Sequence, residues 1–102
     1  MLLSLDGPAR QVKLSLANTT ATFVQVESQP LSERKVITLQ PLDGNIKIYF
    51  AASNETPTAA YVLDNGFTLF KNAITSLEAA DTQRVFISSI DDNCDVILAE
   101  RA

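Results

Sequence analysis

The feature that most constrains the fold is a series of short runs in which apolar and polar residues alternate. In residues 11–16, Val12, Leu14 and Leu16 alternate with polar neighbours, which is the period-two pattern of a half-buried strand. Because turn-forming residues separate these runs, we expect an all-β chain, an antiparallel β-sandwich or jelly roll of about eight strands. The expected strands are residues 11–16, 20–27, 35–40, 46–51, 61–63, 67–70, 84–90 and 95–100.

The turns between these runs predict hairpins. Asp43-Gly44 separates 35–40 from 46–51, and this pair suits the positive φ angles of tight hairpin turns. Asn65-Gly66 separates 61–63 from 67–70 in the same way. The last two runs, 84–90 and 95–100, are expected to pair with each other across the acidic turn between them.

One segment has a competing helical pattern. In "FKNAITSLEAAD", residues 70–81, the apolar Phe70, Ile74 and Leu77 have helical spacing. We expect at most one short helix, near Ser76 to Asp81.

The chain of 102 residues fits one domain, with a flexible N-terminal arm (residues 1–10) and a sandwich (residues 11–102). In the arm, Leu2, Leu3 and Leu5 precede Asp6-Gly7-Pro8, a sequence that breaks regular structure. We expect the leucines to dock on a neighbouring subunit or an underlying shell; the alternative is a frayed terminus. No apolar run approaches the length of a membrane-spanning helix, and the start does not resemble a signal peptide.

Charge argues against nucleic acid as a partner. The net charge is −4, and the sequence offers only the short basic pair Arg34-Lys35 where a nucleic-acid protein has a basic patch. These two residues open a strand and are expected on the rim of a sheet. They are either solvated charges or contacts for an acidic neighbour, such as the turn Asp91 to Asp95 of another copy.

Residues with catalytic or metal-binding chemistry are few. The chain has no histidine, which excludes Ser-His-Asp and Cys-His arrangements, and the single Cys94 is expected to be structural. Asp91, Asn93 and Asp95 resemble the first half of a calcium loop, but the later glycine and glutamate positions hold Val96 and Ala102. We expect an acidic turn there, and no enzyme activity, cofactor or metal.

Four pieces of the sequence follow one another from Ala21 to Glu100: "ATFVQVESQPLSERKVITLQP", "IKIYFAAS", "NETP" followed by "NGFTLFKNAITSL", and "RVFISS" with "DVILAE". In this order they resemble short β-domain structural proteins of tailed bacteriophages. Two positions depart from that pattern. Ala51-Ala52 stand where the family usually has Gly-Gly, so the first loop is open to reshaping, and Asn72 stands where a Gly is usual. Asn tolerates the left-handed region, so the second turn is expected to survive.

The resemblance implies a virion component without enzymatic activity, made in the bacterial cytoplasm and attached to the capsid as a decoration protein. Its expected partners are other copies of itself, with a trimer favoured, and the major capsid protein or another virion protein. A tail, neck or baseplate accessory protein is one alternative. A carbohydrate- or receptor-binding β-module is another, and with no Trp and only Tyr49 and Tyr61 as polar aromatics it ranks second.

Overall fold

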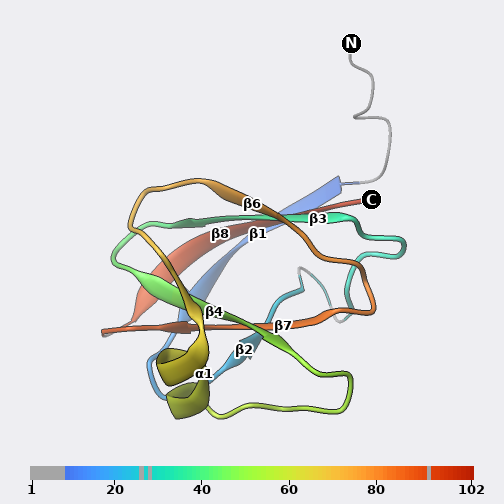
Figure 1. Ribbon diagram of the computed structural model, residues 1–102. Coiled ribbons are helices and arrows are strands. Elements are labelled where there is room, and N and C mark those ends of the chain that lie inside the picture. The colour runs from blue at the N-terminus through green and yellow to red at the C-terminus, as the bar shows by residue number, and fades with distance from the viewer. Residues whose placement is uncertain (1–8, 26, 28, 92) are drawn as a thin grey trace.

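A computed structural model describes residues 9–25, 27, 29–91 and 93–102 as a β-sandwich. Two antiparallel four-stranded sheets face each other, and one short helix lies on the outside of one of them (Figure 1). The first sheet contains, in spatial order, β1 (Ala9–Leu16), β8 (Cys94–Arg101), β3 (Val36–Pro41) and β6 (Thr75–Glu78). The second contains β2 (Thr22–Phe23), β7 (Arg84–Ser89), β4 (Ile46–Ala51) and β5 (Phe67–Leu69). The expected sandwich is confirmed.

The chain passes from one sheet to the other at almost every connection. Only β4 and β5 are consecutive strands of the same sheet, and α1 (Ala59–Asn65) lies between them in the sequence. The orders β1-β8-β3-β6 and β2-β7-β4-β5 make this sandwich a jelly roll, the eight-stranded arrangement of two Greek keys.

The core lies between the sheets and consists of the inward residues of each alternating run. Burial alternates along β3 and β8 as the period-two pattern predicts. The innermost side chains, each at most 1 % exposed, are Leu16, Val24, Ile37, Leu39, Ile46, Ile48, Val85, Ile87, Val96 and Leu98.

The predicted hairpin around Asp43-Gly44 is wrong. Strand β3 pairs with β8 and β6, whereas β4 pairs with β7 and β5, so the link between them crosses from one sheet to the other. Among the described glycines none has a positive φ. The predicted pairing of 84–90 with 95–100 is wrong for the same reason, since β7 and β8 belong to different sheets.

The run that contains Tyr61 to Leu63 is a helix and not a strand. The Thr58 hydroxyl caps α1 by accepting a hydrogen bond from the Tyr61 backbone N–H at 3.2 Å. On the sheet side, Val62 is fully buried in a second apolar cluster, against the outer face of the second sheet, with Ala51 and Phe86. This packing stabilises a helix too short to persist alone.

The helix predicted near Ser76 to Asp81 is also wrong, because Thr75–Glu78 forms β6 along β3. Leu77 packs against the core while Ser76 and Glu78 are exposed. The helical spacing of Phe70 and Ile74 marks two exposed side chains and not a buried helix face.

The first described strand, β1, begins at Ala9, so Ala9 and Arg10, which the sequence assigned to the arm, are strand residues. The predicted docking residues Leu2, Leu3 and Leu5 lie outside the described residues. Within the described part of the chain, no helix is long and apolar enough to cross a membrane.

Candidate functional site

Arg34 lies just before β3 with its guanidinium fully buried. Every nitrogen of the guanidinium donates a hydrogen bond within the chain. The acceptors are Ala79 O (2.9 Å) for Nε, Val24 O (3.0 Å) and Glu100 Oε2 (2.8 Å) for Nη1, and Ala80 O (2.9 Å) and Gln83 O (3.2 Å) for Nη2. A guanidinium leaves water at acceptable cost only when its donors are satisfied in this way.

The partner carboxylate belongs to Glu100, near the end of β8, and is equally buried. Its Oε1 accepts from Arg10 Nε of β1 at 3.0 Å, and its Oε2 also accepts from the Leu31 backbone N–H at 3.2 Å. We call Arg10, Arg34 and Glu100 the buried charge network. The expectation that Arg34 lies exposed on a rim is therefore wrong: the guanidinium completes the interior and is not accessible to another copy.

Lys35, the next residue, is exposed. Its backbone joins two strands, because its N–H donates to Arg101 O at 2.8 Å and its carbonyl accepts from Ala79 N at 2.9 Å. Its side chain borders an open depression of about 520 Å³ shared with Val36 and Glu78. A contact between Lys35 and an acidic neighbour stays a prediction.

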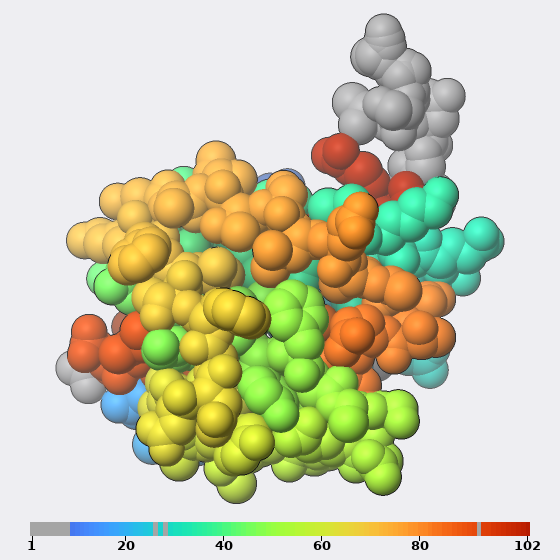
Figure 2. Space-filling view, in the orientation of Figure 1, coloured from blue at the N-terminus to red at the C-terminus, as the bar shows by residue number. Residues whose placement is uncertain are grey.

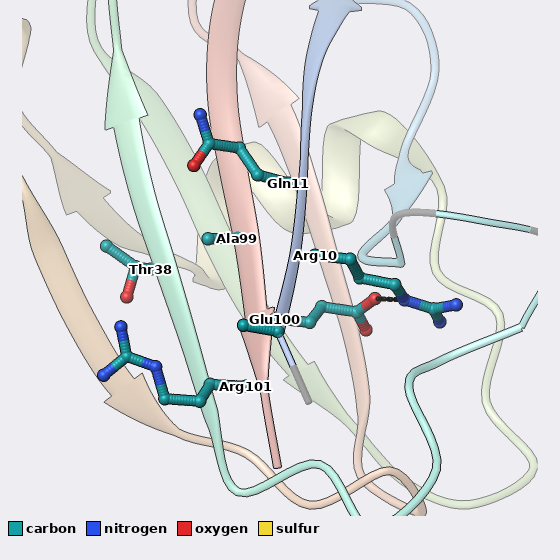
Figure 3. A pocket seen from close by; sticks show the side chains of 7 residues that line it. Arg10, Gln11, Thr38, Ala99, Glu100 and Arg101 are labelled. Carbon is teal, nitrogen blue, oxygen red and sulfur yellow. Dashed lines mark hydrogen bonds and ion pairs between the residues drawn. The ribbon is translucent and has the colours of Figure 1, made fainter. Parts of the chain in front are cut away.

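A smaller groove of about 310 Å³ lies over β1, β8 and β3, where the start of β1 pairs with the end of β8. Ala99 lies between Gln11 and Thr38 in the strand register. Because its side chain is small, the surface is recessed at this position. Figure 3 shows Gln11, Thr38 and Arg101 on one side of the sheet, while Glu100 and Arg10 meet on the other side. The groove thus has one exposed cation, Arg101, at its border.

The most unusual surface is apolar. Phe67, Phe70 and Ile74 are 70 %, 63 % and 70 % exposed. Phe67 begins the edge strand β5, and Phe70 and Ile74 lie in the connection from β5 to the edge strand β6. We call these three residues the apolar edge. Figure 2 shows this segment, in yellow to gold, on the visible surface of the molecule. Large apolar side chains left exposed within one short segment make that segment a candidate interaction surface.

The turn between Phe70 and Ile74 is held in place by hydrogen bonds. The backbone N–H groups of Lys71 and Asn72 donate to Asn45 Oδ1 (2.8 Å) and Pro41 O (2.7 Å), respectively. Asn72 adopts the left-handed region with φ 67°, which confirms the expectation that Asn serves at this turn. Its carbonyl accepts from Gln40 Nε2 at 3.2 Å. The apolar edge is therefore displayed by a fixed backbone.

A second aromatic feature lies beside α1. Tyr49 donates its hydroxyl to the Glu55 carboxylate, at 2.9 Å to Oε2, and its ring meets that of Tyr61 edge-on with centroids 5.3 Å apart. The hydrogen bond to Glu55, helped by partial burial, raises the pKa of Tyr49 well above its ordinary value. Tyr61 is 46 % exposed, so this pair offers an aromatic face with a carboxylate behind it.

The acidic turn forms contacts within the chain. Asp91 and Asn93 are exposed, while the Asp95 carboxylate accepts from Ser15 Oγ at 2.6 Å and its N–H donates to Asp43 Oδ2 at 3.0 Å. Cys94 is buried. Over the described ranges, no group of three Asp, Glu, Cys or His residues is arranged to hold a metal ion.

Two features escaped the sequence reasoning. Glu100 shares its strand parity with Val96 and Leu98, so the alternation placed it inward, and an inward glutamate requires a cationic partner. The apolar edge was assigned to a strand and a possible helix, and no signal in the sequence distinguished exposed from buried positions there.

Fold and surface together define a jelly-roll domain that contains a hydrogen-bonded buried charge network and displays an exposed apolar edge. Comparisons with protein-family models, with curated proteins and with solved structures find no match.

Proposed function

We propose that this protein is a non-enzymatic structural component of a tailed-bacteriophage virion, which self-associates and attaches to the capsid as a decoration protein. The observation that carries the proposal is the apolar edge. Phe70 and Ile74 stand in water at the two ends of a turn whose backbone is fixed by hydrogen bonds, and Phe67 is exposed at the start of the adjoining strand β5. A surface that is ordered before binding loses little conformational entropy on association, so its burial contributes to affinity.

The sequence resemblance to phage β-domains gains support from the turn at Asn72. That family usually has a glycine at this position, and the backbone here has the positive φ that a glycine accommodates. The other departure, Ala51-Ala52, begins at the end of β4, where Ala51 is buried beside Val62 of α1. Here the side chain of Ala51 packs under a helix, a contact that glycine cannot make.

In this proposal the protein is made in the bacterial cytoplasm and functions in the virion. Its partners are other copies, in a trimer, and the major capsid protein. Lys35, exposed beside the depression that contains Glu78, is a contact point for an acidic neighbour. A tail, neck or baseplate location is the variant of the same proposal in which a different virion protein is the partner.

The test is incorporation into particles. The tagged chain is expressed during infection by the phage that encodes it, and particles purified on a density gradient are probed for the tag and reconstructed by electron microscopy. We expect the chain to co-sediment and to appear as protrusions on the capsid, and the double variant F70S/I74S to be depleted from particles. Intact particles that lack the chain would contradict the proposal.

A second candidate function, glycan or receptor binding, is favoured by the exposed aromatic rings. Tyr61 stands edge-on to Tyr49, whose hydroxyl is held by Glu55, and aromatic faces next to carboxylates suit sugar rings. A glycan array distinguishes this function. Retention of a glycan by the wild type, lost in Y61A while self-association is unchanged, would favour it.

A further inference from the structure

We infer that the leucine segment at the start of one copy docks on the apolar edge of a second copy. The inference rests on the proposed self-association and names both surfaces of the contact. The donor is the segment with Leu2, Leu3 and Leu5, and the acceptor is Phe67, Phe70 and Ile74.

The two surfaces match in chemistry. The donor offers three aliphatic side chains followed at once by Asp6. The acceptor offers three large apolar side chains, and exposed Lys71 lies among them in the sequence. Burial of apolar area supplies the attraction, and the Asp6 carboxylate facing the Lys71 ammonium gives the contact a direction.

The strand register shows that the three leucines and Asp6 cannot together cover the apolar edge of their own chain. Ala9 pairs with Arg101, Arg101 with Val36, and Val36 with Glu78, so Ala9 and Glu78 lie level across the first sheet. Ile74 lies four residues further along and three strands across, roughly 20 Å from Ala9 by the usual strand spacings. Leu5 precedes Ala9 by four residues and reaches at most about 14 Å, whereas Leu2, seven residues before Ala9, reaches about 25 Å when fully extended. Leu2 and Leu3 could thus touch Ile74 of their own chain only when fully extended, and Leu5 and Asp6 could not reach the apolar edge at the same time.

The acceptor must therefore belong to another copy. Donor and acceptor are different surfaces of the same chain, so the contact is head-to-tail. Such contacts generate a closed ring when the rotation between copies closes, and an open chain otherwise. A ring of three copies fits the proposed trimer, with each chain donating one segment and accepting one.

Two variants test this contact, and each keeps only one of the two docking surfaces. One lacks residues 2–6 and keeps the apolar edge; the other, F70S/I74S, keeps the leucine segment. We expect the wild type to oligomerise and each variant to be monomeric by light scattering. An equimolar mixture of the two should contain a complex of two chains and nothing larger, because the contact can form only once.

A charge exchange sharpens the experiment. D6K placed in the F70S/I74S chain should weaken the mixed complex at least tenfold, and K71E in the truncated chain should restore much of that affinity. Circular dichroism melts of every variant check folding. Because Phe70 and Ile74 are exposed, we expect the variants to have the melting temperature of the wild type. K71E alone replaces the double variant if the serines prevent folding.

The outcomes separate this inference from the proposed function. If the truncated chain still oligomerises, or the mixture stays monomeric while the wild type assembles, the docking contact is wrong and self-association stands. If the wild type is monomeric at millimolar concentration, self-association in solution fails and the docking contact fails with it.

Discussion

The buried charge network and the apolar edge reverse the usual distribution of residues in opposite ways. Arg34 and Glu100 place a full ion pair inside the sandwich, whereas Phe67, Phe70 and Ile74 place large apolar groups in water. Charged residues are rarely buried unless paired, and exposed large apolar groups are informative when they gather. The first region completes the fold and the second is available to a partner.

Hydrogen bonding explains the difference. Besides Glu100, Arg34 reaches backbone carbonyls from two segments: Val24 after β2, and Ala79, Ala80 and Gln83 in the connection from β6 to β7. It thereby ties together segments that lie outside the paired strands. The side chains of the apolar edge are mostly exposed to solvent, so their removal should leave the fold intact.

The largest effect should come from breaking the charge network. Replacing Glu100 with Ala leaves the Arg34 guanidinium buried without its counter-ion, and removing one partner of a buried pair costs about 3–5 kcal/mol of unfolding free energy. E78A is the matched control, because Glu78 is exposed on β6 at nearly the same strand level. It should change stability by less than about 0.5 kcal/mol. Equal urea midpoints for the two variants would refute a structural role for the network.

A smaller effect is expected at Gly66, which joins α1 to β5. A Cβ there would stand 2.6 Å from the Ile48 carbonyl oxygen and 2.7 Å from that of Val62. Since both are backbone atoms, the chain must move, and overpacking of this kind costs about 1–3 kcal/mol. G44A is the control, because its Cβ meets nothing within 4 Å. Urea unfolding should show G66A destabilised and G44A near neutral or slightly stabilised; the reverse order would contradict the account of this junction.

An effect confined to alkaline pH is expected for Tyr49. Its pKa is raised by the hydrogen bond to Glu55, so above about pH 10 the folded state retains a proton that the unfolded state releases. Stability must therefore fall as pH rises through that range. Melting temperatures of wild type and Y49F, measured from pH 8 to 11, should converge with increasing pH as the wild type loses its advantage. Parallel curves would show that Tyr49 is not responsible.

The smallest effect on stability should come from the apolar edge. F70S/I74S removes side chains that are 63 % and 70 % exposed. Urea denaturation of the dilute monomer should therefore show a change in unfolding free energy of less than about 0.5 kcal/mol. The same variant should lose self-association at concentrations where the wild type assembles. A large loss of stability would move these residues from the interaction surface to the core.

Most strand positions were predictable from the sequence, whereas strand partners were not. Alternation shows which side chains face inward, and 46–51 matches β4 residue for residue. The alternation does not show which strand pairs with which. The turn residues Asp43-Gly44 therefore predict a hairpin, although β3 and β4 lie in different sheets. The expected number of strands is matched through two compensating errors, since 61–63 is helical and Thr75–Glu78 is a strand.

The helix was missed because its stabilisation is tertiary. Thr58 before two alanines was an available cap signal, but the Asn65-Gly66 pair favoured a turn. What decides the conformation is Val62 buried against Phe86 of β7, a contact invisible in the local sequence. At the candidate site, alternation along β8 was an available but unused signal for an inward Glu100, whereas the exposure of Phe67 and Ile74 depends on which strands form the sheet edges.

Hydrogen–deuterium exchange as a function of protein concentration tests most directly that one region serves the fold and the other assembly. Peptides covering residues 67–74 should gain protection in the wild type as concentration rises and show no gain in F70S/I74S. Peptides covering 31–34 and 79–83, which the charge network fixes, should be equally protected in both proteins at every concentration. Protection of 67–74 that is independent of concentration, in a protein that nonetheless assembles, would contradict the assignment of the apolar edge to self-association.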